Sequence, residues 1–138
     1  MAKISAKGAV ITITDSGAVA RTISSDVDSF ELSQDAGALE VTGFTDPSKN
    51  YIPGLPVYEV TLNVIYDNTA TTGAWAVLKG DFLLSTPTTL TIKPDASGQT
   101  LTLYCMVQNL PMKGTPNGKL EIGSVKLVPM GTTAPAWA

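Results

Sequence analysis

Residues 57–66 read VYEVTLNVIY, and this stretch decides the fold. Every second side chain is apolar or aromatic, at Tyr58, Val60, Leu62, Val64 and Tyr66. The side chains between them include the polar residues Glu59, Thr61 and Asn63. A repeat of two residues is typical of a β-strand with one buried face. The stretch therefore predicts a strand with one face in a core and one polar face.

The same alternation recurs on both sides of this strand. Two strands over 8–14 and 18–23 are predicted around the turn Asp15-Ser16-Gly17. A second hairpin is predicted to turn at Asp35-Ala36-Gly37, with Leu39 and Val41 on its returning strand. Further strands are predicted over 88–93, 99–108 and 119–128. The last of these changes phase at Gly123-Ser124, which predicts a β-bulge.

One short helix is predicted at about 71–80, within TTGAWAVLKG. Thr71 or Thr72 can cap its start, and Gly80 fits the position after its end. A helix of about two turns needs tertiary support, so we expect it to dock on a sheet through Trp75. The expected fold is mainly β, with two packed antiparallel sheets in a sandwich or barrel-like arrangement and one short flanking α-helix.

Composition predicts one domain over 1–138, because a chain of 138 residues can bury a core without cross-links. The single cysteine, Cys105, falls within a strand pattern and is expected to be a buried structural thiol. No signal peptide is expected at MAKISAKGAVITI, and no stretch reaches the length of a membrane span. Charged residues make up only 15% of the chain, and such a neutral surface is suited to burial against copies of itself.

Three segments outside the predicted strands are candidates for contact with other subunits. The longest, a loop over 43–56, contains three prolines and carries Tyr51, Ile52 and Leu55. Loops of this length are usually functional. The other two are terminal arms, over 1–8 and 129–138. The second arm has no partner among the predicted strands yet carries Trp137, so we expect this tryptophan to pack on another subunit.

The residue types of catalytic, cofactor and metal sites are absent or out of place. The chain contains no histidine, which excludes the common Ser-His-Asp triad and most zinc sites. It also lacks a glycine-rich phosphate loop. Asp26 and Asp28 resemble the start of a calcium loop, but Phe30 and Glu31 stand where an oxygen ligand and a glycine are needed. We therefore predict no catalytic residue, no cofactor and no metal.

Paired carboxylates leave one enzymatic hypothesis. Glu31, Glu40 and Glu59 could converge on the polar face of one sheet, as the two acids of glycosidases do. The sequence predicts no pocket around them, and a solvated acidic face is the preferred interpretation. If an enzyme exists, replacing all three should abolish turnover.

Charge is distributed unevenly along the chain. Residues 22–78 carry eight acids and one base, whereas residues 1–21 and 79–138 are each net basic by two charges. No cluster of basic residues of the kind that grips a nucleic acid duplex is present.

The order of these features resembles the tail tube (major tail) proteins of long-tailed bacteriophages. The resemblance rests on SFELSQDAGALEVTGFTD, SKNYIPGLP, VYEVTLNVIYDN and the helix within TATTGAWAVLKGDF, followed by a closing strand hairpin. It covers nearly the whole chain. The tube protein of type VI secretion has a similar fold, so the resemblance does not separate the two families.

The resemblance implies a structural virion protein that forms stacked, hexameric rings, the tail conduit for DNA ejection. It implies assembly in the host cytoplasm with other tail proteins, and passage of the tape-measure protein and DNA through the lumen without specific binding. In the family, the long loop and both termini bridge subunits and rings. Strand alternation then favours Glu31, Glu40, Glu59, Thr61 and Asn63 as lumen-facing residues, where negative charge would repel phosphates.

A small β-sandwich binding module is the alternative, either a capsid decoration protein or a carbohydrate-binding domain. Such a module needs exposed aromatic side chains gathered on one sheet face. The candidates Tyr51, Tyr104 and Trp137 are scattered along the sequence. Replacing Tyr104 separates the two hypotheses, because it should abolish glycan binding in a module and polymerisation in a tube subunit.

Overall fold

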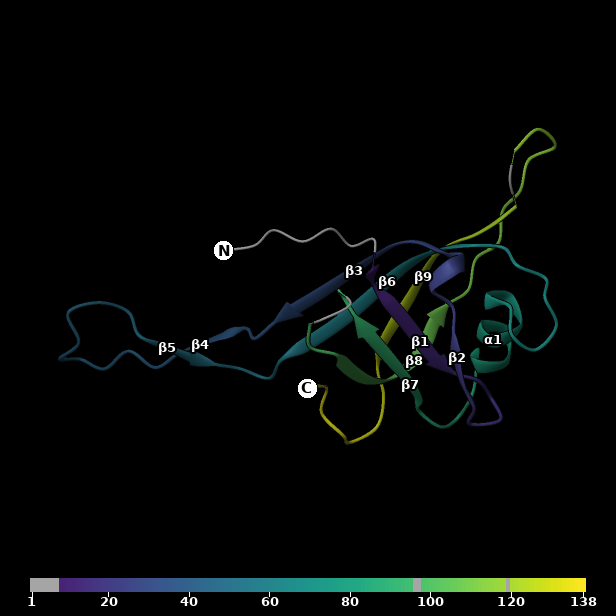
Figure 1. The fold of residues 1–138 in the computed structure, drawn as a ribbon. Helices are drawn as coiled ribbons and strands as arrows, with labels where there is room; N and C mark the ends of the chain where they lie inside the picture. Colours follow the sequence, from purple (N-terminus) through teal and green to yellow (C-terminus); the bar gives the residue numbers. More distant parts are fainter. Residues whose placement is uncertain (1–7, 96–97, 119) are drawn as a thin grey trace.

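The computed structural model describes residues 8–95, 98–118 and 120–138 (Figure 1). Its strands are β1 (Val10–Thr14), β2 (Ala20–Thr22), β3 (Val27–Asp35), β4 (Ala38–Glu40), β5 (Tyr51–Pro53), β6 (Val57–Ile65), β7 (Thr88–Lys93), β8 (Leu101–Asn109), β9 (Glu121–Pro129) and β10 (Ala136–Trp137). A short 3-10 helix covers Ser24–Asp26, and the α-helix α1 covers Ala74–Asp81. Except for Gly8, the predicted arm at 1–8 lies outside the described residues.

Eight of the strands form one antiparallel sheet in the order β2-β1-β7-β8-β9-β6-β3, with β10 paired to β8. The β3–β6–β9 half lies across the β1–β7 half, so the sheet makes two layers (Figure 1). The predicted mainly β, antiparallel fold with one short flanking helix is confirmed. The two layers belong to one continuous sheet, because β8 pairs with both β7 and β9.

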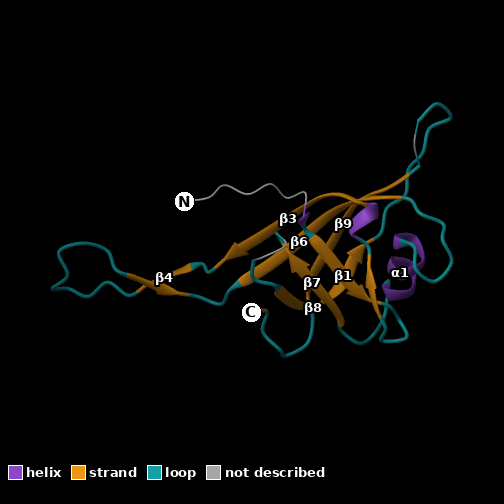
Figure 2. Ribbon diagram, viewed as in Figure 1, coloured by secondary structure: helices purple, strands orange, loops and turns teal. Residues whose placement is uncertain are grey.

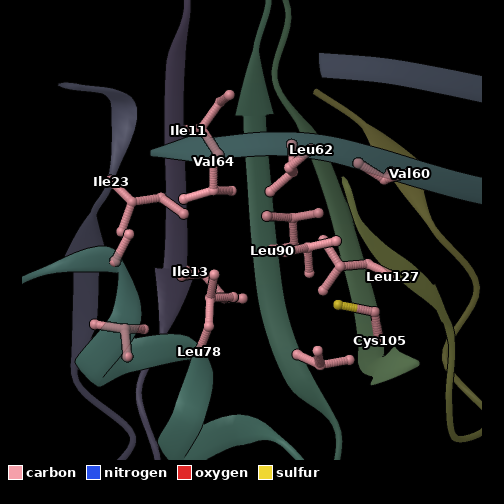
Figure 3. Packing of buried hydrophobic residues seen from close by; sticks show 14 of the residues in the cluster. Ile11, Ile13, Ile23, Val60, Leu62, Val64, Leu78, Leu90, Cys105 and Leu127 are labelled. Atoms are coloured by element: carbon pink, nitrogen blue, oxygen red, sulfur yellow. The ribbon is translucent and has the colours of Figure 1, made fainter. Parts of the chain in front are cut away.

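The core lies between the two layers and collects the inward side chains of the predicted strands. Val60 and Leu62 of β6 point toward Leu90 of β7 and Leu127 of β9 (Figure 3). All four are fully buried, as the two-residue alternation requires. Cys105 is also buried and free of any disulfide, so the predicted structural thiol is confirmed.

The predicted β-bulge lies where β9 pairs with β6. Val64 is opposite Gly123 and Ile65 is opposite Glu121, so Ile122 is the extra residue. Gly123 has φ +89°, a conformation that favours glycine over residues with a Cβ atom. Because of this shift, both Ile122 and Val125 point into the core.

The helix α1 begins later than predicted and is capped from elsewhere in the chain. Gly73 precedes it, and the Ala74 amide donates to the Asp26 carboxylate at 3.2 Å. Neither Thr71 nor Thr72 caps the helix, because the chain supplies a remote carboxylate instead. Val77 and Leu78 form its buried face, while Trp75 is half-buried and packs against Tyr66, with ring centroids 5.8 Å apart. Within the described residues, no helix has the length and hydropathy needed to cross a bilayer.

The chain at residues 36–56 differs most from the prediction. The hairpin predicted to turn at Asp35-Ala36-Gly37 is wrong, because β3 pairs along its length with β6 and β4 pairs with β5. Gly37, at φ +63°, redirects the chain without reversing it. Residues 36–56 thus form a projecting hairpin, which we call the arm (Figures 1 and 2). Within the predicted loop 43–56, residues 51–53 are a strand.

The C-terminal segment also differs from the prediction. The sequence left residues 129–138 without a partner strand, but Ala136 and Trp137 pair with Thr102 and Leu101 of β8. Ala138 and Thr100 exchange two backbone hydrogen bonds beyond this pair, at 2.7 and 2.9 Å. The segment occupies a part of the β8 edge that β9 leaves open. The C-terminal segment therefore pairs with a strand of its own subunit.

Candidate assembly surfaces

A polar face covers the outward side of β3, β6, β9 and the end of β8. Asn63 lies at its centre, donating to the Ser29 hydroxyl at 2.7 Å and accepting from the Ser124 hydroxyl at 2.8 Å. Asn109 extends this network by donating to the Ser124 carbonyl at 3.3 Å. The hydrogen bonds run across all four strands, so the polar side chains hold one another in place.

A second row of outward residues runs beside this network. Glu31 is opposite Thr61, and Thr61 is opposite Lys126. The Lys126 ammonium contacts the Glu59 carboxylate at 3.2 Å, from β9 to β6. We call the outward residues of both rows the polar face; its members are Ser29, Glu31, Glu59, Thr61, Asn63, Asn109, Ser124 and Lys126.

Four of the five predicted lumen-facing residues lie together on the polar face: Glu31, Glu59, Thr61 and Asn63. Glu40 does not join them, because it lies on β4 of the arm, opposite Tyr51 of β5. The prediction for Glu40 was wrong because it placed the strand that contains this residue beside β3, whereas that strand pairs with β5. The convergence of Glu31, Glu40 and Glu59 that the enzymatic hypothesis needs is therefore contradicted.

The arm exposes apolar side chains along one of its faces. Leu39 and Ile52 are cross-strand partners, 57% and 48% exposed. Val41 follows on the same face, where its amide donates to the Asn50 carbonyl. Leu55 is 90% exposed at the base of the arm. A row of apolar side chains in water is typical of a surface that binds a partner.

The predicted contact residues Tyr51, Ile52 and Leu55 are all exposed on the arm. Phe44, near the tip, is completely exposed and was not among the candidates. The exposure of Phe44 could have been predicted from the sequence. Phe44 lies in a loop between Gly43 and Pro47, where no alternation of apolar and polar residues indicates a buried face. Trp137 is 39% exposed, and its indole donates to Gln34 of β3 at 3.2 Å.

The two end strands of the large sheet have no further neighbour among the described residues. These are β3, nine residues long, and the shorter β2. Unpaired edges of this kind can add a strand from another chain. A second projection, which includes residues 110–118, extends from the body at another position than the arm (Figure 1). A Lys113–Glu121 β-bridge closes its base.

The structure offers little support for the two alternative functions, an enzyme with paired glutamates and a small β-sandwich binding module. A cavity of about 130 Å³ is lined by Asp28 and Glu121, but not by the three glutamates proposed for catalysis. No group of three or more potential metal ligands occurs among the described residues. The aromatic candidates for a binding module stay apart: Tyr51 is on the arm, Tyr104 is half-buried on β8 and Trp137 is on β10.

One buried carboxyl stands apart from these surfaces. Asp81, at the end of α1, is 2% exposed, and neither of its oxygens has a hydrogen-bond partner among the described residues. Burial, together with the nearby Asp15 carboxylate, raises the pKa of Asp81 to about 7. Burial and the neighbouring Asp81 raise the pKa of Cys105 to about 12, so this thiol stays protonated and unreactive.

No protein-family model matches the chain. No curated protein matches it either. Solved structures do match it along its whole length. A chain from the tail of an empty gene transfer agent particle, refined with C6 symmetry, aligns at a TM-score of 0.80 and 15% identity, covering 99% of both chains.

Two further structures extend this comparison. A chain from the virion of a native gene transfer agent particle aligns at a TM-score of 0.79 and 13% identity, again covering 99% of both chains. A chain from the sheath-tube complex of an extracellular contractile injection system aligns at 0.68 and 11% identity, covering 99% of this chain and 91% of the other. The chain therefore has a phage tail tube-like fold, which it shares with the related contractile injection systems.

Proposed function

We propose that this chain is a structural subunit of a phage tail tube, assembling into stacked rings of six that conduct DNA during ejection. The single observation that carries the proposal is the alignment of 99% of the chain with 99% of a chain in a C6-symmetric tail. An alignment of this coverage spans the arm as well as the body, which supports the proposal that the arm has a role in assembly.

Within a ring, we propose that the free edge of β3 in one subunit meets the free edge of β2 or an adjoining segment in the next. Both edges are open in the described chain. Edge-to-edge pairing would join the sheets into a closed barrel and satisfy backbone groups that otherwise invite aggregation. The polar face would then line the bore, with Glu31, Glu59, Thr61 and Asn63 toward the lumen.

Between rings, we propose that the arm of each subunit docks on a subunit of the adjacent ring. Leu39, Ile52 and Leu55 would lose their exposure to water in this contact. Tyr51 and Phe44 would add aromatic area. Trp137 remains a candidate for contact with a neighbour through its exposed part, although its strand already pairs within the subunit.

The remaining parts of the proposal concern partners and location. The subunit would be assembled in the host cytoplasm with other tail proteins and would reside in the tail of the virion. The tape-measure protein and DNA would occupy the bore without sequence-specific binding, because the polar face carries no cluster of basic residues. The proposed role requires no catalysis.

Negative-stain microscopy of the purified protein tests this function. At high concentration, and with the tail-tip initiator added if needed, we expect rings or tubes with six-fold symmetry in end views. Sedimentation across a concentration series should show the same transition from monomer to polymer. A protein that stays monomeric at high concentration with the initiator present would contradict the proposal.

A further inference from the structure

The polar face contains a single basic residue, and that residue is paired. In β3, β6, β8 and β9, which are described in full, Lys126 is the one lysine or arginine. Its ammonium lies 3.2 Å from the Glu59 carboxylate. Its neighbours on the face are the hydroxyl of Thr61 and the amide of Asn109, whose oxygen accepts from the Lys126 backbone at 2.9 Å.

Folding stability does not explain why Lys126 and Glu59 form an ion pair at this position. The side chains of Lys126 and Glu59 are 40% and 38% exposed, and exposed ion pairs add little to folding stability. An unpaired lysine surrounded by hydroxyl and amide groups would be a good contact for phosphate oxygens. Glu59 occupies the ammonium at hydrogen-bonding distance and cancels its field nearby.

We propose that Glu59 masks Lys126 and thereby prevents DNA phosphates from binding to the polar face. The proposal rests on the function above, in which this face lines the bore. Each ring would otherwise present six ammonium groups to the DNA that passes through it. Glu31 has a different role on the same face, because its cross-strand partner is the hydroxyl-bearing Thr61, whereas Glu59 contacts the Lys126 ammonium itself. Glu59 is thus the acid that determines whether the wall binds DNA.

Two substitutions of equal charge change separate these roles. Glu59→Gln and Glu31→Gln each remove one negative charge from the polar face, but only the first frees Lys126. The double variant Glu59→Gln/Lys126→Gln removes the freed amine as well. A simple dependence on net charge predicts the same result for the first two variants, whereas masking predicts that only Glu59→Gln gains DNA binding.

The first readout needs no assembly. Acylation of Lys126 by an amine-reactive reagent, followed by mass spectrometry with Lys93 as internal reference, measures how available the Lys126 amine is for reaction. We expect Glu59→Gln to raise the acylation rate at Lys126 by about threefold or more, and Glu31→Gln to leave it unchanged. Equal acylation rates at Lys126 in the wild type and in Glu59→Gln would show that Glu59 does not mask Lys126 and would overturn the proposal.

The second readout uses assembled tubes and labelled linear duplex DNA in co-sedimentation. At about 50 mM salt we expect Glu59→Gln tubes to retain at least about threefold more DNA than wild-type or Glu31→Gln tubes, with the difference lost by about 200 mM salt. The double variant should return to the wild-type level. Equal retention by Glu59→Gln and Glu31→Gln tubes would overturn the proposal.

Closed circular DNA distinguishes the bore from the outer surface, since a closed circle cannot thread through a tube. Retention of linear but not circular DNA by Glu59→Gln tubes is expected. Equal retention of both would place the polar face outside the tube and overturn its role in the bore. If no variant assembles, including the wild type with initiator, the tube function fails, while the acylation rates still decide whether Glu59 masks Lys126.

Discussion

Strands β3 to β6 form one long hairpin, and its inner and outer halves differ in how far their apolar side chains are exposed to water. In the inner half, Phe30 and Leu32 of β3 face Leu62 and Val60 of β6, and all pack on the core. In the outer half, the arm, Leu39 faces Ile52 in the same antiparallel manner, yet both are exposed. The two halves have similar apolar pairs and a similar ladder. The difference indicates that the body is completed within the chain, whereas the arm lacks the surface that would cover it.

The largest effect on folding is expected in the inner half. Leu62→Ala would leave a cavity beneath β6, because Leu62 is fully buried and its neighbours can close the gap only in part. We expect the free energy of unfolding to fall by about 2–5 kcal/mol, measured by urea denaturation of the monomer. Leu39→Ala in the arm is the matched control. An equal loss from both substitutions would show that the arm is covered within the monomer.

A smaller effect is expected at Asp81, where the body buries a carboxyl instead of an apolar group. Its pKa rises from 3.8 to about 7 on folding, so the folded protein holds a proton that the unfolded chain releases. Stability should therefore fall as pH rises from about 4 to about 7 and then level off. Asp81→Asn should remove this slope and stabilise the protein at pH 8 by about 2–4 kcal/mol, relative to wild type.

Thermal unfolding at several pH values measures this difference. The exposed Asp28→Asn serves as the control and should leave the slope between pH 4 and 7 in place. A wild-type stability that rises steadily over that range would contradict a buried, protonated Asp81.

The smallest effect on folding is expected in the arm, together with a large effect on assembly. The double variant Leu39→Ser/Ile52→Ser should change the free energy of unfolding of the monomer by no more than about 0.5 kcal/mol, because both side chains are already exposed. The same variant should lose tube formation in sedimentation, because each apolar side chain buried in an interface contributes about 1.5–3 kcal/mol.

Ala38→Ser, on the opposite face of β4, is the matched control for the arm and should still assemble. Normal tubes from the double variant would show that the apolar face of the arm makes no contact that assembly needs. The comparison of the two hairpin halves would then need another explanation for the exposed side chains.

The sequence by itself determined the parts of this protein that depend on local pattern. The strand predicted over 57–66 is found at Val57–Ile65, because every second residue fits a buried face. The alternation of apolar and polar residues also predicted the bulge at Gly123, where its phase changes, and the burial of Cys105. The mainly β fold was predictable for this reason, and so was the grouping of Glu59, Thr61 and Asn63 on one polar face.

Only the tertiary structure decided which strands meet across long stretches of chain. Whether the chain turns back at Gly37 or continues into an arm depends on pairing with residues 51–53, and local pattern does not encode that choice. The cap of α1 comes from Asp26, 48 residues before the amide that it accepts from, and Trp137 pairs beside β8 because β9 leaves that edge open. Hydrophobic alternation fixes which face of a strand is buried, whereas the choice of partner depends on edges and cavities that exist only in the folded chain.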